Sequence, residues 1–209
     1  MLSSTLLAFA LTAFLIEITP GPNMAYLAAL SLSQGARAGS AAVAGITLGL
    51  AVYGVAAAIG LSAIIDNSTV LYETLRWAGV VYLLWLAWRA WAVEREISPQ
   101  ATIDVEASPW IAFRRGLITN LLNPKAAVFY VAMLPDFVQP GSGSAFKQTL
   151  MLSAIYVGIA TAIHAMIVLL ASRLQRVIET PDKRRTIRRM LAVMLAAIAI
   201  WFAWSTERS

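Results

Sequence analysis

The chain of 209 residues is 59% hydrophobic and only 13% charged, which excludes a soluble globular domain and a disordered chain. The lack of cysteine and the single histidine exclude disulfides, thiolate chemistry and poly-histidine metal sites. The net charge of +5 is expected to face anionic lipid and not nucleic acid. These counts indicate a single membrane domain over residues 1–209, with no cofactor.

Six segments approach the roughly 20 apolar residues that a transmembrane helix needs. In chain order they are Leu2–Leu32, Ala41–Ile65, Val70–Trp88, Gly116–Val138, Thr149–Ser172 and Thr186–Thr206. No basic region precedes the first and no cleavage site is clear, so we expect a retained helix and not a signal peptide. The predicted fold is therefore all-α and integral to the membrane, with six transmembrane helices.

The positions of Lys and Arg predict how the chain is oriented. Most of the 16 basic residues fall in the loops after the first, third and fifth spans. Only Arg76, Lys147 and Arg208 fall on the opposite side, while Lys125 lies inside a span. Because cytoplasmic loops carry the excess of Lys and Arg, both termini are predicted to face the periplasm.

Proline interrupts the first and the fourth predicted spans near their centres. The interruptions are Thr19-Pro20-Gly21-Pro22-Asn23 and Asn120-Leu121-Leu122-Asn123-Pro124-Lys125. Proline frees the carbonyl four residues back, which needs a new partner in lipid. Thr19 and Asn123 are suitable N-caps followed by proline, so each break predicts a second half-helix whose N-terminus suits a carboxylate.

The two breaks divide the chain into similar halves. Pro20 and Pro124 lie half the chain length apart, and each opens a unit of three predicted helices. Because three is odd, the second unit must insert upside down relative to the first. We predict inverted repeats at about 1–92 and 112–209 with a linker at about 93–111, a pattern typical of secondary transporters. Tyr53-Gly54 and Tyr156-Val157-Gly158 are a weak echo between the halves, and two unrelated proline kinks are the simpler alternative.

Ionisable residues inside a span are costly in lipid and are functional candidates by default. Glu17 is predicted to bind a substrate ammonium or to carry a coupled proton, or else to be a structural partner of Lys125 or of freed backbone. Lys125 is predicted to neutralise a substrate carboxylate, or to pair with Glu17 when the site is empty. His164 is a candidate proton relay, with a hydrogen-bonded histidine between helices as the alternative.

Neutral polar groups and backbone complete the predicted site. Asn23, Asn120 and Asn123 offer donors and acceptors that suit a zwitterion, or they cap helices. The predicted substrate-binding residues are Glu17, Thr19, Pro20, Gly21, Pro22, Asn23, Asn120, Asn123, Pro124 and Lys125, with Glu17 and His164 as proton-coupling candidates. A single deep carboxylate favours neutral substrates over cationic ones. Gly45 and Gly49 are spaced for close helix packing.

Several of these motifs, in this order and spacing, resemble the signatures of a known family. Beside the two breaks they include Ser31–Gly39, Ala78–Leu86 and Leu134-Pro135-Asp136-Phe137, and the resemblance runs nearly end to end. The family is the LysE/RhtB amino-acid exporters. The resemblance implies a bacterial inner-membrane exporter of amino acids or close derivatives, driven by proton exchange, and it suggests a homodimer.

The sequence therefore predicts a proton antiporter that works by alternating access, and not an enzyme. A membrane-embedded enzyme is one alternative, although the acidic residues and the histidine are dispersed in the sequence. A passive channel or a structural membrane subunit is another, and a channel would give flux that does not depend on a gradient.

Overall fold

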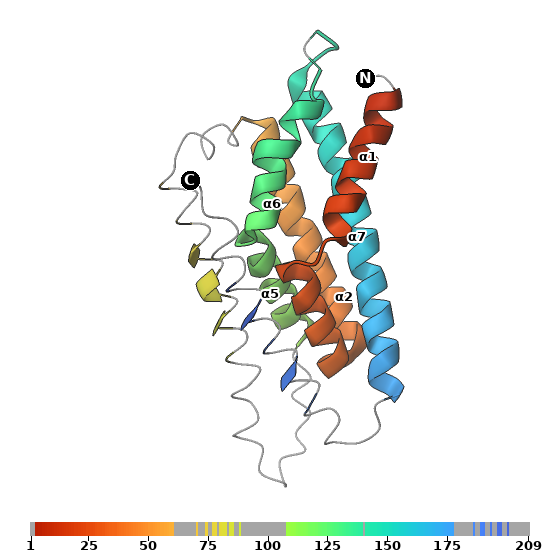
Figure 1. Cartoon of the computed structure of the whole chain (residues 1–209), viewed down its shortest axis with the longest axis vertical. Coiled ribbons are helices and arrows are strands. Elements are labelled where there is room, and N and C mark those ends of the chain that lie inside the picture. The colour runs from red at the N-terminus through yellow and green to blue at the C-terminus, as the bar shows by residue number, and fades with distance from the viewer. Residues whose placement is uncertain are drawn as a thin grey trace.

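The computed structural model describes residues 3–60, 108–139 and 141–177, together with individual residues between 70 and 88 and between 186 and 200. The described residues form helices and no strand, which agrees with the all-α prediction. The elements are α1 (Ser3–Ile18), α2 (Pro22–Ala58), α5 (Pro109–Leu121), α6 (Pro124–Val128), the π-helix η1 (Phe129–Met133), the 3-10 helix η2 (Pro135–Phe137) and α7 (Ala145–Val177) (Figure 1).

α2 consists of two helices that meet at Gly35. Gly35 has a φ of 80° and a ψ of −176°, a conformation that glycine alone adopts readily. A Cβ on Gly39 would overlap Ser31 Oγ, although eight residues of continuous helix extend for about 12 Å. The chain therefore turns back at Gly35 (Figure 1). The first predicted span thus corresponds to α1 together with the part of α2 before Gly35. The part of α2 after Gly35 contains most of the second predicted span.

The fourth predicted span is bent at its predicted break. α5 ends at Leu121 and α6 begins at Pro124, and the helix axes on the two sides of the break differ by 52°. The π-helix η1 follows α6 directly, and such turns occur frequently at functional sites. The fifth predicted span lies entirely within the single helix α7.

The length and apolar character of these elements fit a membrane. By length and composition α2, α7 and the bent pair formed by α5 and residues 125–137 can each cross a bilayer. The outward faces of α1 and α7 carry large apolar side chains, such as Leu11 and Leu170, which are more than half exposed. Lipid stabilises such faces and water does not. The chain is a multi-pass membrane protein.

The third and sixth predicted spans fall largely outside the described residues. Those residues of 70–88 and 186–200 that are described are helical, and Tyr82 and Ala196 pack against the core. The predicted linker at about 93–111 is described only from Ser108, which is the N-cap of α5. The six-helix inverted repeat and the orientation of the termini remain predictions.

Glycine allows α2 and α5 to cross in contact. A Cβ on Gly45 would overlap the Phe113 carbonyl, and a Cβ on Gly49 would lie 2.6 Å from Asn120 Oδ1. The predicted close packing at Gly45 and Gly49 is therefore confirmed, and α5 is the partner. The contact of Gly49 with Asn120 places the end of α5, just before its break, against α2.

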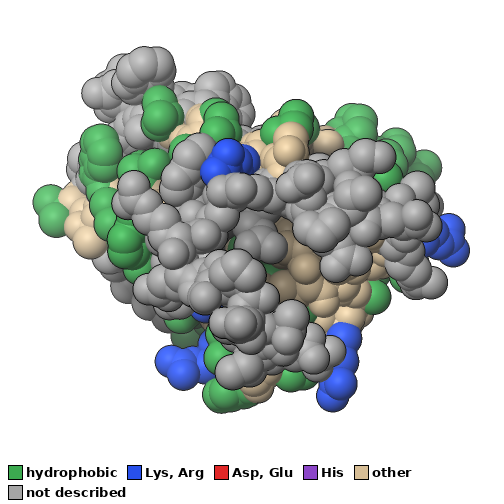
Figure 2. Space-filling model, turned by 90° about the horizontal axis from the view of Figure 1, so that it is seen from below, with side chains coloured by type: hydrophobic (Ala, Val, Ile, Leu, Met, Phe, Trp, Pro, Cys, Tyr) green, Lys and Arg blue, Asp and Glu red, His purple; other side chains and the backbone are tan. Residues whose placement is uncertain are grey.

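Four of the described arginines lie at one end of the bundle. Arg37 follows the turn at Gly35, Arg114 and Arg115 lie in the first half of α5, and Arg173 lies near the end of α7. Figure 2 views this end and shows basic side chains but no acidic one among the described residues in view. A membrane face with this charge is the expected cytoplasmic face.

Candidate functional site

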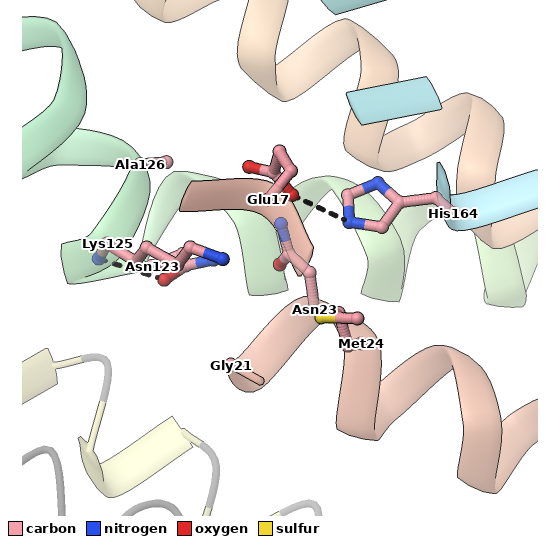
Figure 3. A pocket seen from close by; sticks show the side chains of 8 residues that line it. All are labelled: Glu17, Gly21, Asn23, Met24, Asn123, Lys125, Ala126 and His164. Atoms are coloured by element: carbon pink, nitrogen blue, oxygen red, sulfur yellow. Dashed lines mark hydrogen bonds and ion pairs between the residues drawn. The ribbon is translucent and has the colours of Figure 1, made fainter. Parts of the chain in front are cut away.

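The two helix breaks enclose a small pocket inside the bundle. Its walls come from the end of α1, the start of α2, the start of α6 and the middle of α7 (Figure 3). The lining residues are Glu17, Gly21, Asn23, Met24, Asn123, Lys125, Ala126 and His164. All of them except Met24 and Ala126 are predicted site residues, so the fold brings together candidates from three distant parts of the sequence.

Glu17 supplies the acidic side of the pocket. It lies in the last turn of α1 and is only 5% exposed. Its Oε1 accepts a 2.6 Å hydrogen bond from the Tyr156 hydroxyl, and its Oε2 lies 3.5 Å from His164 Nε2. The partners of Glu17 are thus on α7. Neither Lys125 nor freed backbone, which were the expected structural partners, bonds to Glu17 within the described part of the chain.

His164 is buried beside this carboxylate and is only 1% exposed. Neither ring nitrogen has a hydrogen-bond partner among the described residues, so His164 is not the hydrogen-bonded interhelical histidine of the alternative interpretation. The approach of Nε2 to Glu17 becomes an ion pair when the ring is protonated. Figure 3 shows the ring directed from α7 toward Glu17.

Aromatic rings fix the Tyr156 hydroxyl in place. The Tyr156 ring stacks on Phe129 with centroids 3.7 Å apart and meets Tyr130 edge-on at 5.5 Å. Tyr53 in turn stacks on Tyr130, with ring centroids 5.8 Å apart. Phe129 and Tyr130 open the π-helix η1, so this irregular turn lies directly behind the hydroxyl that binds Glu17. Such packing limits the freedom of the Tyr156 ring.

The break between α1 and α2 differs in detail from the prediction. The N-cap of α2 is Gly21, with Pro22 at the first helical position, and not Thr19 followed by Pro20. The Thr19 hydroxyl instead donates to the Leu15 carbonyl at 3.0 Å, inside α1. The side chains of Thr19 and Pro20 are exposed and do not line the pocket, whereas Pro22 is buried. Thr19 does not cap a helix, because the next helix begins only at Pro22 and the Thr19 hydroxyl donates back into α1.

The break between α5 and α6 follows the prediction. Asn123 is the N-cap, its Oδ1 accepts from the Lys125 backbone N–H at 3.0 Å, and Pro124 takes the first helical position. The Asn120 carbonyl, which Pro124 frees, accepts from the Asn123 N–H at 2.9 Å. The Tyr53 hydroxyl donates to the Leu121 carbonyl at 2.7 Å. Backbone groups exposed by the break are therefore paired within the bundle.

Asn120 is a predicted site residue that the fold places outside the pocket. Its side chain is fully buried against Gly49, and neither of its amide atoms has a hydrogen-bond partner among the described residues. The sequence placed it on the break but could not show which face of α5 it occupies. The structure directs it toward α2.

Lys125 joins the two breaks. Its Nζ donates a 2.8 Å hydrogen bond to the Thr19 carbonyl, across more than one hundred residues of sequence. The side chain crosses Gly21, where an added Cβ would lie 3.3 Å from Lys125 Cδ. The ammonium group therefore rests on a neutral acceptor and keeps its charge uncompensated by any carboxylate within 4 Å in the described residues.

Comparison with known proteins matches this chain to a family of translocators. The model of the family described as LysE type translocator covers residues 14–206, which include both breaks and every pocket residue. The chain belongs to the LysE family. No solved structure matches it.

Relatives within the LysE family cover the chain to different extents. It is 27% identical to a homoserine/homoserine lactone efflux protein of Salmonella typhi over 94% of both chains. It is 29% identical to an uncharacterized membrane protein of Vibrio cholerae over 94% of this chain and 95% of that one. It is 34% identical to a leucine efflux protein of Enterobacter sp. (strain 638) over 60% of each chain. The family is one of translocators and not of enzymes, as predicted.

The sequence did not predict that Met24 and Ala126 line the pocket, or that Tyr156 bonds to the pocket residue Glu17. Met24 and Ala126 follow the predicted residues Asn23 and Lys125 closely, so adjacency to the breaks is the signal that could have found them. The similarity between Tyr53-Gly54 and Tyr156-Val157-Gly158 pointed to Tyr156, but it does not indicate which residue Tyr156 contacts. Its contact with Glu17 depends on how α1 packs against α7.

Proposed function

We propose that this protein exports amino acids or close derivatives from the cytoplasm by proton antiport, with alternating access between two inverted three-helix repeats. The observation that carries the proposal is the separation of charge across the pocket. Lys125 lies on one side, and Glu17 with His164 lies on the other (Figure 3). An amino acid presents a carboxylate and an ammonium group on one carbon, so it matches both sides. The names of the efflux relatives agree with such a substrate.

The substrate carboxylate would bind to Lys125 in place of the Thr19 carbonyl. The hydrogen bond to Thr19 joins a cation to a neutral acceptor, and a carboxylate makes a stronger, charge-assisted bond. The α2 helix begins beside it at Pro22, and the unpaired N–H groups of that first turn favour an anion. Gly21 leaves space next to the ammonium group of Lys125.

The substrate ammonium would bind on the opposite side, to Glu17 and Asn23. Asn23 is 6% exposed and lines the pocket, and its Oδ1 has no hydrogen-bond partner in the part of the chain that the structure describes. A proton and an ammonium group then compete for one carboxylate. This competition supplies the coupling, because Glu17 releases the substrate outside when it takes up a proton and binds substrate again after the proton leaves inside. His164 would relay that proton.

The class of substrate and the direction of transport follow from the charges. Glu17 is the one carboxylate among the described pocket residues and is needed for the α-ammonium group, so a neutral side chain fits better than a cationic one. The basic end of the bundle would then face the cytoplasm, with the protein in the bacterial inner membrane. Transport outward then runs from that end through the pocket.

Uptake into inside-out membrane vesicles tests the proposal. Vesicles containing the protein should accumulate labelled homoserine or leucine when an acidic interior is imposed, and a protonophore should abolish the accumulation. Glu17→Gln should remove the dependence on the pH gradient, and Lys125→Met should reduce kcat/KM about a hundredfold, as expected for a lost buried charge pair.

The matched controls are Asp136→Asn and Lys147→Met, which remove the same charges at exposed positions. Both should transport as the unchanged protein does. Equal uptake with and without a gradient would indicate a channel. Normal gradient-driven uptake in both Glu17→Gln and Lys125→Met would show that this pocket is not the site.

A further inference from the structure

Two of the described residues that line the pocket have apolar side chains and take no part in the proposed binding of charge. They are Met24, in the first turn of α2, and Ala126, in the first turn of α6. Figure 3 shows Met24 on the α2 side of the pocket and Ala126 on the α6 side. Ligand pockets combine a few polar groups that fix orientation with apolar side chains that cover the rest of the ligand. These two residues are therefore the candidates for contact with the side chain of an amino acid.

Met24 and Ala126 hold equivalent positions in the two half-helices. Each is the third residue of its helix, which begins at Pro22 in α2 and at Pro124 in α6. Ala126 is only 2% exposed and ends at its Cβ, so it presents a short and fixed surface. Met24 is partly exposed and has a long side chain. The two half-helices thus present one short and one long apolar group to the same pocket.

Little free space remains in the pocket. The described side chains leave no room between them for a water molecule, so a substrate can enter only when a side chain moves. Glu17, Asn123 and Lys125 are each fixed by a hydrogen bond. Met24 has an unbranched thioether side chain with three rotatable bonds, which adapts readily to irregular space. Rotation of the Met24 side chain therefore makes room without breaking a hydrogen bond.

We propose that Met24 contacts the side chain of the substrate and determines which amino acids the protein exports. This inference rests on the proposed export function and names the residue that selects the substrate within it. Met24 would pack against an aliphatic side chain such as that of leucine, while Lys125 and Glu17 hold the two charged groups. Leucine should be preferred over homoserine, because a hydroxyl placed against an apolar side chain loses its hydrogen bonds to water.

The ratio of two kcat/KM values tests this role of Met24. Uptake of leucine and of homoserine is measured in the same inside-out vesicles, so the amount of folded protein cancels in the ratio. Met24→Ser replaces the long apolar group by a short polar one and should shift the ratio toward homoserine about tenfold or more, as expected for lost apolar contact. Met24→Leu keeps an apolar side chain of similar volume and should leave the ratio close to that of the unchanged protein.

The size of residue 24 should also determine the size of the side chain that is accepted. Met24→Ala should raise kcat/KM for phenylalanine relative to that for alanine about tenfold, and Met24→Phe should lower it. The matched control is Met166→Ser, because Met166 is 61% exposed and lies two residues after the pocket residue His164 in α7. It should leave both ratios unchanged.

Cysteine labelling detects the contact without a transport measurement. The chain contains no cysteine, so Met24→Cys introduces a single thiol. In the purified intact chain, leucine should protect this thiol from N-ethylmaleimide, and glycine, which has no side chain, should protect it less at the same fraction of protein bound. Ser142→Cys, at an exposed position between η2 and α7, should be labelled equally with and without amino acid.

The outcomes separate this inference from the export function. If the unchanged protein transports leucine but Met24→Ser and Met166→Ser give the same ratio, the role of Met24 is disproved while export stands. Equal protection of Met24→Cys by glycine and leucine would likewise contradict contact with the substrate side chain. If the unchanged protein transports neither leucine nor homoserine, the export function itself is disproved.

Discussion

Tyr53 and Tyr156 hold matching places in the two halves of the chain, and each donates its hydroxyl to the half-helix that precedes a break. Tyr156 bonds the Glu17 carboxylate at the end of α1, and Tyr53 bonds the Leu121 carbonyl at the end of α5. The two tyrosines are separated by almost the same number of residues as Glu17 and Leu121. This reciprocal pairing supports the proposed inverted repeat, although the acceptors differ: one is a titratable side chain and the other is backbone.

The difference in acceptor predicts different effects of two identical substitutions. Tyr53→Phe removes a bond to backbone and should lower the stability by about 1 kcal/mol while transport remains coupled to protons. Tyr156→Phe removes a bond to the proposed proton carrier and should change the ratio of protons to substrate. The measurements are thermal denaturation in detergent and proton flux per substrate in liposomes. Equal coupling in both variants would contradict the role given to Glu17.

Contact between α2 and α5 predicts a stability difference between two glycines. Gly49→Ala places a methyl group 2.6 Å from Asn120 Oδ1 and 2.9 Å from Asn120 Cβ, so the variant should lose about 1–3 kcal/mol. Gly158→Ala is the matched control, because a Cβ there meets nothing within 4 Å. It should be neutral, or stabilising by up to about 1 kcal/mol from its helix propensity. Denaturation temperatures of the two variants in one detergent compare them directly.

The sequence predicted those features of the fold that depend on local rules. Proline inside an apolar segment predicts a helix break, because it cannot continue the preceding helix but suits the first turn of the next one, as Pro22 and Pro124 do. Asn123 before Pro124 caps the next helix. Charge inside an apolar segment marked Glu17 and Lys125 as candidates, and both line the pocket. These signals need no knowledge of which helix packs against which.

Features that depend on packing between helices were not predictable in this way. The pairing of Glu17 with Tyr156 requires that α1 lie on α7, and the position of Asn120 against Gly49 requires the crossing of α2 and α5. Thr19 is a residue type that often caps helices, but whether its hydroxyl accepts from a following N–H or donates to the preceding helix depends on backbone geometry that the sequence does not contain. The prediction starts the second half-helix at Pro20, the first proline of Pro20-Gly21-Pro22, whereas the structure starts it at the second proline, Pro22.

The turn at Gly35 predicts a backbone cost. Its φ of 80° with an extended ψ is costly for any residue with a side chain, so Gly35→Ala should lose about 1–3 kcal/mol of stability. A Cβ would also lie 3.0 Å from Gln175 Oε1, which offers a second explanation for any loss. Combining Gly35→Ala with Gln175→Ala separates them in thermal denaturation. Backbone strain predicts no recovery in the double variant, and full recovery would assign the loss to the side-chain contact.

Asn123 has two roles that one pair of substitutions can separate. Its Oδ1 caps α6 through the Lys125 N–H, and its side chain also lines the pocket. Asn123→Ala should lose about 1 kcal/mol of stability, whereas Asn123→Ser keeps an oxygen that can cap the helix and should melt close to the unchanged protein. Because serine lacks the amide group that faces the substrate, its KM for amino-acid uptake should still rise a few-fold. A serine variant with both normal melting and normal KM would reduce Asn123 to a cap alone.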